Sequence, residues 1–298
     1  MASAEYEALR KLLKPGLADP ADSAATAREK LLALHGHPFS KDVAVERASL
    51  GGVPCAWLTA PEARGAERVV LHFHGGAFVA CGVEDYLFYG ALLSAVLAAP
   101  VLEVGYRLAP EHRFPAALDD CVAAWRGVLA SGIVPGRVGF VGDSCGGALM
   151  VSAMLRSREL GLPMPAAGAA LGGWFDLEAG GSIAHEPERE GEPFLDLAWL
   201  RKRGRDYVGP EGDPGNPLVS PVHADLRGLP PLLLQAGECD GARESAVRFA
   251  AKAGGDGVAV TLELWPEMIH GWHGLGPHIP EVRASFAHVS RFFTEALA

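Results

Sequence analysis

The sequence predicts an α/β protein in which helices cover a mainly parallel sheet. Apolar runs of strand length alternate with longer amphipathic helical patterns from about residue 68 onward, and this alternation is typical of parallel sheets. Hydrophobic residues make up 49% of the 298 residues and charged residues 21%, which is a composition typical of compact folded proteins. Because α/β chains of this length commonly form one core, we expect a single domain over residues 1–298.

Six segments have the length and the apolar content of strands, and helical patterns lie between them. The expected strands are Val69–His74, Val101–Tyr106, Arg137–Asp143, Ala166–Trp174, Pro231–Gly237 and Val258–Trp265. The expected helices include FPAALDDCVAAWRGVLA, GGALMVSAMLRSREL, ARESAVRFAAKA and EVRASFAHVSRFFTEAL. In such a sheet the carboxyl ends of the parallel strands meet at one edge, and ligands bind beyond that edge.

Two regions interrupt the alternation of strands and helices. Residues 1–40 have a helical pattern and precede the first strong strand, and residues 179–208 are charged and contain EPEREGEP. Insertions that follow the carboxyl ends of strands are placed to cover a ligand site. We therefore expect both regions to form a helical cap over the site. The alternative for the charged stretch is a solvated loop.

Charge, the amino terminus and the cysteines exclude several classes of protein. A formal net charge of −10 at pH 7 argues against nucleic acid as a partner, because phosphates need cationic groups. The stretch MASAEYEALRKLLKPGL mixes charges with isolated leucines, unlike a secretory signal or a membrane span, so we expect a cytoplasmic protein with no span. We expect reduced, mostly buried thiols, because neither disulfide nor zinc-site spacing fits Cys55, Cys81, Cys121, Cys145 and Cys239.

The stretch Gly142–Gly146 has the pattern G-x-S-x-G between a predicted strand and a predicted helix. In that context a serine nucleophile stands on a sharp turn, with glycines where side chains would collide. The turn presents the hydroxyl of Ser144 at the start of a helix, where the helix dipole stabilises developing negative charge. The alternatives are an ordinary glycine-rich turn and a phosphate-binding loop, although no lysine follows as in a P-loop.

A serine nucleophile needs a base and an acid, and in strand–helix folds of this kind both follow it in the order acid, then histidine. Asp240 follows one predicted strand and His270 follows the next, so both side chains are expected beside the serine turn. We predict Asp240 as the acid and His270 as the base. Glu238 is the rival acid and His273 the rival base. Asp143 is expected to be structural, because neighbours on a tight turn point elsewhere.

The stretch HFHGGAF ends the first strong strand with paired glycines. Backbone N–H groups without neighbouring side chains can approach an oxyanion. We predict that Gly75, Gly76 and Cys145 donate the N–H groups of an oxyanion hole.

Two pairs of histidines raise the alternative of a metal site. His72 and His74 alternate onto one face of a strand, but no third ligand appears nearby. A histidine at a strand end bonds loop backbone more often than a metal. The same interpretation applies to His35 and His37, and we expect no metal.

An ordered set of motifs resembles the hormone-sensitive lipase family of esterases within the α/β-hydrolase superfamily. The motifs are HGGAF, YRLAPEHRFPAALDD, GDSCGG, WFDL, NPLVSPVHADLRGLPPLLLQAGECD and WPEMIHGW, and the resemblance runs from about residue 40 to the end. It implies the α/β-hydrolase fold, with an eight-stranded, mostly parallel sheet and a helical cap, and ester hydrolysis with no cofactor. It also implies a catalytic Ser144, Asp240 and His270, with oxyanion donors Gly75, Gly76 and Cys145.

The sequence departs from the family pattern at several positions near these motifs. Ala77 replaces the third glycine of the usual HGGG, Cys145 replaces a usual alanine, and Ala148 replaces a usual asparagine. The family's DPLRD is DGARE here, so Asp240 remains while the residues after it change. The thiol of Cys145 either narrows the pocket or packs underneath it. Each departure bears on the choice of substrate, and none removes a predicted catalytic group.

The predicted function is that of a serine carboxylesterase acting on small esters with short acyl chains, from acetyl to butyryl. Aromatic side chains are expected to wall the substrate pocket, namely Phe78, Tyr86, Phe194, Trp199 and Trp272. The alternatives are lactone or amide hydrolysis, a lyase or cyclase, and a small-molecule receptor, because one fold hosts many functions. The last predicted strand offers an edge through which a homodimer would pair.

Overall fold

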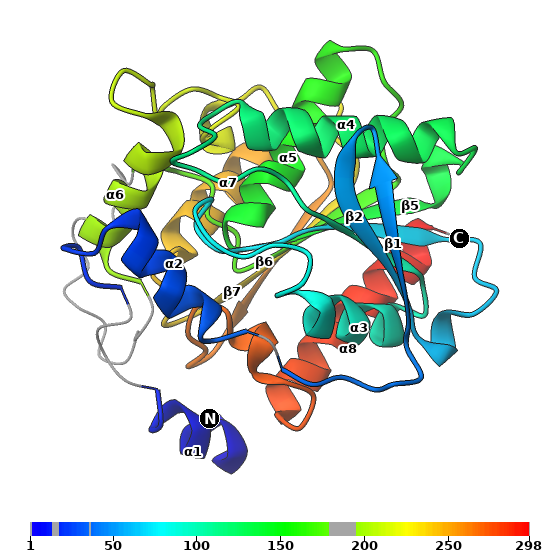
Figure 1. Ribbon diagram of the computed structural model, residues 1–298, viewed down its shortest axis with the longest axis horizontal. Helices are drawn as coiled ribbons and strands as arrows, with labels where there is room; N and C mark the ends of the chain where they lie inside the picture. The colour runs from blue at the N-terminus through cyan, green and yellow to red at the C-terminus, as the bar shows by residue number, and fades with distance from the viewer. Residues whose placement is uncertain (1, 14–17, 36, 179–194, 298) are drawn as a thin grey trace.

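Figure 1 shows the computed structural model of the chain, which describes residues 2–13, 18–35, 37–178 and 195–297. Within these residues the strands form one eight-stranded sheet in the order β1-β2-β4-β3-β5-β6-β7-β8. Neighbouring strands from β4 to β8 are parallel, whereas β2 is antiparallel to both of its neighbours. The predicted α/β class and the mostly parallel sheet are therefore confirmed.

All six predicted strands are present, with their ends shortened by a few residues. They are β3 (Val69–Phe73), β4 (Val101–Val104), β5 (Val138–Asp143), β6 (Ala167–Leu171), β7 (Leu232–Gly237) and β8 (Val260–Trp265). Nearly every residue of β3 to β7 is buried, because helices cover both faces of these central strands. Strand β8 lies at one edge of the sheet, where Leu264 is exposed. The homodimer expected through this edge stays a prediction.

Two further strands of the sheet are not among the six predicted. Strands β1 (Ala44–Leu50) and β2 (Val53–Thr59) form a hairpin at the other edge of the sheet. Gly51 and Gly52 connect them with φ angles of 60° and 85°, and paired glycines are the residues that tight hairpin turns require. The Gly-Gly pair between two strand-like segments was the signal that could have predicted this hairpin.

Helices form a layer on each face of the sheet (Figure 1). Helices α3 (Leu87–Leu97) and α8 (Pro280–Ala296) pack against each other on one face, and α4 (Ala116–Ala130), α5 (Cys145–Glu159) and α7 (Arg243–Gly255) cover the other. Four of these helices match the predicted helical stretches. No helix among the described residues has both the length and the apolar character needed to cross a bilayer.

Three further helices lie outside the two layers. They are α1 (Ala4–Arg10), α2 (Ala24–Leu32) and α6 (Leu197–Val208). Figure 1 shows α2 close to α6, and the side chains of Lys202 and Arg203 in α6 donate hydrogen bonds to backbone carbonyls just before α2, including that of Asp22. The amino-terminal segment and α6 are therefore joined although about 180 residues separate them.

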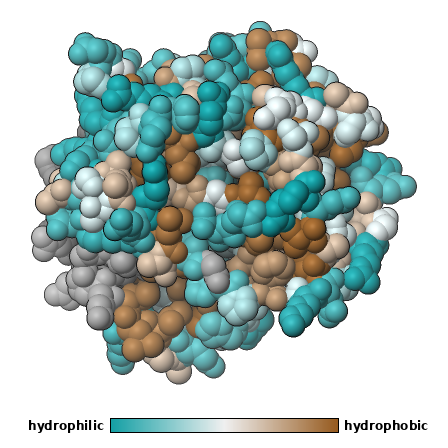
Figure 2. Space-filling model, viewed as in Figure 1, coloured by the Kyte–Doolittle hydropathy of each residue, from teal (hydrophilic) through white to brown (hydrophobic). Residues whose placement is uncertain are grey.

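The surface over α1 is partly apolar. Figure 2 shows apolar side chains at the lower left of the face on which Figure 1 places α1. Leu12, which follows α1, is 73% exposed, whereas Leu9 and Leu13 line a cavity that also contains Ser144. This segment therefore presents leucines to solvent on one side and to the cavity on the other.

Candidate active site

Ser144 stands on a strained turn between β5 and α5. Its backbone angles, φ 52° and ψ −123°, lie outside the regions that residues other than glycine favour. Such strained backbone is common at functional sites. The flanking glycines are required by close backbone contacts. A Cβ on Gly146 would lie 1.8 Å from the carbonyl oxygen of Phe73, and one on Gly142 would lie 2.2 Å from that of Gly146. The turn is thus possible only with glycine at both positions.

The structure brings Ser144, His270 and Asp240 into one hydrogen-bonded chain. Ser144 Oγ lies 2.8 Å from Nε2 of His270, and Nδ1 of His270 lies 2.9 Å from Oδ1 of Asp240. The same carboxylate oxygen accepts the N–H of Ala242 at 2.7 Å, which fixes its direction. Asp240 and His270 are buried, with 5% and 8% of their surface exposed. The hydroxyl of Ser144 is thus bonded to the imidazole of His270, and the buried carboxylate of Asp240 orients that imidazole.

The two rival residues bond other groups. Glu238 is exposed, and its carboxylate accepts the backbone N–H of Glu267. His273 is buried, and its Nε2–H donates to Oε1 of Gln235 at 3.0 Å. Burial lowers the pKa of His273 to about 3, so this ring stays neutral at ordinary pH. Asp240 and His270, and not these two residues, complete the chain described above.

The structure supports Gly76 as an oxyanion donor but not Gly75. Gly76 lines the cavity beside Ser144, and so does Ala77, which the sequence analysis did not include. Gly75 differs from the prediction, because its N–H donates to the hydroxyl oxygen of Tyr86 at 3.1 Å. Among the described residues the N–H groups of Gly76 and Ala77 donate to no backbone carbonyl. Cys145 is the first residue of α5, directly after Ser144.

The thiol of Cys145 packs underneath the site. The residue is fully buried, and its sulfur accepts the N–H of Phe78 at 3.3 Å. Tyr106 Oη lies 3.9 Å from the same sulfur. Of the two alternatives left by the sequence, the thiol therefore supports the loop from below and does not narrow the cavity. Burial raises the pKa of Cys145 to about 12, so the sulfur remains a neutral thiol.

The strand histidines bond protein groups, in the way expected for structural histidines. His72 lies between two carboxylates, with Nδ1 2.8 Å from Glu103 and Nε2 3.1 Å from Asp143. His74 donates from Nδ1 to the carbonyl of Gly75 at 2.7 Å and stacks on the ring of Tyr106. Burial lowers the pKa of His74 to about 4.

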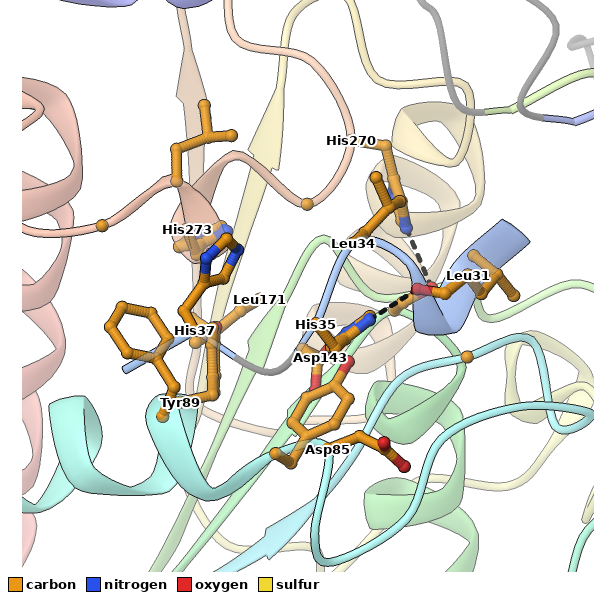
Figure 3. Close-up of a pocket in the computed structure, with 18 of the residues that line it drawn as sticks. Leu31, Leu34, His35, His37, Asp85, Tyr89, Asp143, Leu171, His270 and His273 are labelled. Carbon is orange, nitrogen blue, oxygen red and sulfur yellow. Dashed lines mark hydrogen bonds between the residues drawn. The ribbon is translucent and has the colours of Figure 1, made fainter. Parts of the chain in front are cut away.

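A cavity of about 640 Å³ opens onto Ser144 and His270. Figure 3 shows that it is enclosed by side chains from distant parts of the chain, labelled there as Leu31, Leu34, His35, His37, Asp85, Tyr89, Asp143, Leu171, His270 and His273. Leucines from α1, α2 and the segment before α6 add apolar walls. The cavity is thus mainly apolar, with imidazole and carboxylate groups near the hydroxyl, as in many small-molecule sites.

The five predicted pocket residues have different positions. Tyr86 and Trp199 line the cavity. Phe78 is buried away from it and stacks on Tyr207 with ring centroids 3.9 Å apart. Trp272 is also buried away from it, against the rings of Trp265 and His273. Phe194 lies outside the described residues. The prediction was wrong for Phe78 and Trp272 because large aromatic side chains fill the core as readily as they line a site.

One group among the described residues has the spacing of metal ligands. Asp176, Glu178 and His223 offer ligand atoms that lie within 4.8 Å of one another. Arg248 donates to Oδ2 of Asp176 at 2.6 Å, so the buried carboxylate of the group already has a cationic partner. The group contributes nothing to the cavity around Ser144.

Comparison with known proteins identifies the family. The family described as alpha/beta hydrolase fold matches residues 70–274. A curated relative named acetyl-hydrolase, from Streptomyces hygroscopicus, is 35% identical over 302 residues, which cover 99% of this chain and 98% of the relative. A solved structure of an esterase from the bacterial hormone-sensitive lipase (HSL) family has a TM-score of 0.93, 33% identity and full coverage of both chains. The chain belongs to the hormone-sensitive lipase family.

Two further similar proteins agree with this result. Carboxylesterase/phospholipase LipF of Mycobacterium tuberculosis is 32% identical over 244 residues, which cover 79% of this chain and 64% of that protein. The crystal structure of EstE5 soaked with p-nitrophenyl butyrate has a TM-score of 0.92 and 32% identity, with 99% of both chains covered. The protein is accordingly a carboxylic ester hydrolase, as the sequence predicted.

Proposed function

We propose that this protein is a serine carboxylesterase that hydrolyses small esters of short acyl chains through an acyl-enzyme intermediate. The observation that carries the proposal is the hydrogen-bonded chain from Ser144 through His270 to Asp240, with contacts of 2.8 and 2.9 Å. Serine is a weak nucleophile by itself, and a histidine within hydrogen-bond distance removes its proton during attack. The open cavity beside the hydroxyl gives an ester access to it.

In the acylation step, Oγ of Ser144 bonds to the ester carbonyl carbon while its proton moves to Nε2 of His270. The Asp240 carboxylate stabilises the imidazolium that forms. The carbonyl electron pair moves to oxygen, and the resulting oxyanion accepts hydrogen bonds from backbone N–H groups. We assign these donors to Gly76, Ala77 and Cys145. Ala77 replaces Gly75 in this role because the N–H of Gly75 already donates to Tyr86.

The tetrahedral intermediate then collapses. The bond to the leaving alcohol breaks as His270 returns its proton to the alcohol oxygen, and an acyl group remains on Ser144. Water attacks this acyl group with His270 again as the base, and the acid leaves as Ser144 regains its proton. Every proton transfer passes through the imidazole of His270, so the reaction requires this ring close to Ser144.

We assign acetyl to butyryl groups as the preferred acyl chains. The name acetyl-hydrolase of the relative that covers nearly the whole chain supports this assignment, as does the use of p-nitrophenyl butyrate with EstE5. A butyryl group occupies a small part of a cavity of about 640 Å³, which leaves most of that volume to the alcohol part of the ester. A series of 4-nitrophenyl esters of increasing acyl length tests the assignment, and a preference for long chains would contradict it.

We also propose that residues 1–40 and 179–208 act as a cap over the site. Side chains from α1, α2 and α6 line the cavity, among them Leu9, Leu31 and Trp199. The hydrogen bonds between α6 and the segment before α2 support one joined unit. Residues 179–194 lie outside the described residues, so the support comes from the remaining parts of both regions.

The decisive test of the proposed function is Ser144→Ala. We expect turnover of 4-nitrophenyl butyrate to fall to the background rate, because no other hydroxyl replaces the nucleophile. Stoichiometric labelling of Ser144 by an organophosphate, followed by mass spectrometry, provides an independent readout. Turnover of the variant at the rate of the original protein would disprove the mechanism.

Product analysis separates ester hydrolysis from the other reactions that a serine nucleophile supports. A panel of esters, lactones, amides and acetylated metabolites is assayed with the original protein and with Ser144→Ala. We expect free acid and alcohol in equal amounts from the preferred substrate, and we expect esters to react fastest. An elimination or cyclisation product that depends on Ser144 would instead favour a lyase or a cyclase.

A further inference from the structure

The hydroxyl of Tyr86 lies between the loop with the predicted oxyanion donors and the turn that carries Ser144. It accepts the N–H of Gly75 at 3.1 Å and donates to Oδ2 of Asp143 at 2.8 Å. Gly75 directly precedes Gly76 and Ala77, and Asp143 directly precedes Ser144. One buried hydroxyl therefore joins the two backbone segments whose separation determines whether an oxyanion on Ser144 meets its donors.

The two segments approach each other very closely at this point. A Cβ on Gly75 would lie 2.4 Å from Oδ2 of Asp143 and 2.8 Å from Oη of Tyr86. Atoms cannot approach so closely, so only glycine permits this packing. Gly75, predicted to face the oxyanion, is instead required for contact between the loop and the carboxylate of Asp143.

Asp143 is itself held from the interior of the sheet. Its Oδ1 lies 3.1 Å from Nε2 of His72, and Nδ1 of His72 lies 2.8 Å from Glu103 in the neighbouring strand β4. His72 and Glu103 are fully buried. Burial alone lowers the pKa of His72, but the carboxylates of Glu103 and Asp143 outweigh it and raise the pKa to about 10. The His72 ring thus lies between the two carboxylates and pairs with Asp143 from the side of the sheet.

From this geometry we propose that Tyr86 is a positioning residue, whose hydroxyl holds the Gly76–Ala77 donors at the correct distance from Ser144 through Gly75 and Asp143. The inference rests on the proposed serine mechanism and adds a residue to it. The Tyr86 hydroxyl bonds Gly75 and Asp143, so it acts through the backbone of the loop and of the serine turn. Its effect falls on the oxyanion, which exists only in the tetrahedral state, and not on substrate binding.

The first experiment compares Tyr86→Phe with the original protein. Phenylalanine keeps the ring and removes only the hydroxyl, so the cavity wall is retained. For 4-nitrophenyl butyrate we expect kcat to fall about tenfold to a hundredfold, less than the loss of a whole oxyanion donor, and KM to stay within about twofold. Unchanged kcat in folded Tyr86→Phe would overturn the proposal, as would a rise in KM that accounts for the entire loss.

A transition-state analogue provides a readout that a merely structural role would not change. Ser144 adds to the carbonyl of a trifluoromethyl ketone, its proton passes to His270, and the ketone oxygen becomes an oxyanion. The matching methyl ketone binds mainly without this addition. We expect Tyr86→Phe to weaken the trifluoromethyl ketone by the same factor as kcat/KM and to leave the methyl ketone unchanged. Equal weakening of both ketones would overturn the proposal.

Tyr207→Phe is the matched control. The hydroxyl of Tyr207 is also buried, but it has no hydrogen-bond partner among the described residues and does not line the cavity. We expect its kcat and its affinity for the trifluoromethyl ketone to match those of the original protein. Titration of Ser144 with an organophosphate gives the concentration of active enzyme, to which each rate is normalised. Thermal midpoints of both variants show whether they are folded.

A double-mutant cycle with Asp143→Asn tests the route by which Tyr86 acts. If the tyrosine hydroxyl works through the Asp143 carboxylate, the effects on kcat are less than additive, because either change breaks the same link. Fully additive effects would overturn the route. Failure here is distinguishable from failure of the proposed function. An inactive Ser144→Ala together with a fully active Tyr86→Phe disproves only the role of Tyr86.

Discussion

The turn that carries Ser144 and the loop that carries His270 are held in place by different kinds of contact. The serine turn lies between β5 and α5 in the centre of the sheet, where backbone atoms of Gly142, Gly146 and Phe73 touch each other directly. Its geometry comes from close packing that leaves no space for a side chain. A central, fully covered position therefore makes the nucleophile largely independent of the rest of the site.

The histidine loop depends on contacts from distant parts of the chain. The hydroxyl of Tyr6 in α1 donates to the carbonyl of Glu267 at 3.1 Å and accepts the N–H of Ile269 at 3.0 Å. Tyr6 is fully buried, although the helix that carries it is only seven residues long. Glu267 has a φ of 64°, so the loop adopts a conformation that such residues disfavour. The base thus relies on hydrogen bonds from the amino-terminal helix.

The nucleophile and the base are therefore positioned by different parts of the protein. The nucleophile and its oxyanion donors must keep a fixed geometry in every catalytic cycle, and the sheet provides it. The base loop contacts α1, and α1 also contributes Leu9 to the cavity wall. A helix that touches both the cavity and the base loop couples the position of His270 to the packing of the cavity.

Gly146→Ala tests the packing of the serine turn. The added methyl group would lie 1.8 Å from the carbonyl oxygen of Phe73 and 2.7 Å from that of His74, so β3 or α5 must move. We expect little folded protein, and no measurable esterase activity in what remains. Gly136→Ala is the control, because a Cβ there meets no atom within 4 Å, and it should keep full activity. Yield of soluble protein and its circular dichroism decide the result.

Asp240→Asn tests the contact that joins the two regions. An asparagine keeps the size of the side chain but removes the charge that orients and stabilises the imidazolium of His270. We expect kcat to fall by about 10³ to 10⁴, with a thermal midpoint close to that of the original protein. Glu238→Gln changes the rival carboxylate two residues away and should leave kcat within about threefold. A larger loss from Glu238→Gln than from Asp240→Asn would reverse the assignment of the acid.

The contrast also explains how far the sequence predicted the site. Each of the three proposed catalytic residues follows a predicted strand. The local pattern of each stretch therefore indicates its position at the carboxyl edge of the sheet. Those residues meet in the structure as the spacing predicted. The central strands were predicted for the same reason, because their apolar runs are continuous.

Contacts between distant segments had no such local signal. The bond of Tyr6 to the histidine loop spans 261 residues, and nothing near Tyr6 in the sequence indicates it. The N–H of Gly75 was expected at the oxyanion, but the hydroxyl that accepts it comes from Tyr86 at the start of α3. Phe78 and Trp272 were expected in the pocket, but both are buried in the core. The sequence does not show whether an aromatic side chain lines a cavity or packs inside the protein.

Tyr6→Phe tests the support of the base loop. The change removes one buried hydroxyl that bonds two backbone groups of the loop, a contribution of about 1 kcal/mol. We expect kcat for 4-nitrophenyl butyrate to fall about threefold to tenfold, because the His270 ring is held less firmly near Ser144. The effect should exceed that of Tyr207→Phe, which removes a hydroxyl without a partner among the described residues.

A second control separates docking of α1 from support of the loop. Ser3 caps the start of α1, and its Oγ donates to the carboxylate of Glu281 in α8 at 2.8 Å. This bond ties α1 to α8 and not to the histidine loop. Ser3→Ala should therefore weaken α1 docking without the fall in kcat seen for Tyr6→Phe. Equal losses in the two variants would mean that the whole helix, and not the Tyr6 hydroxyl, supports the base.

The pH dependence of stability tests the contacts on the nucleophile side. The carboxylates of Glu103 and Asp143, which outweigh the effect of burial, raise the pKa of His72 from 6.5 to about 10 in the folded protein. A group with a raised folded pKa stabilises the fold fully below its unfolded pKa, and this contribution disappears as the pH rises through the folded value. The contribution of His72 is therefore lost between about pH 6.5 and about pH 10.

Glu103→Gln measures this contribution. The amide still accepts the N–H of His72 but lacks the charge, so the pKa of His72 moves back toward its usual value. We expect the urea midpoint of the original protein to fall more steeply between about pH 7 and about pH 10 than that of Glu103→Gln. Glu84→Gln is the control, because exposed Glu84 pairs with Arg47, which keeps its charge over this range. Parallel curves for the original protein and Glu103→Gln would show that the buried pair is not ionised, and Asp143 would then lack the cationic partner that fixes it beside Ser144.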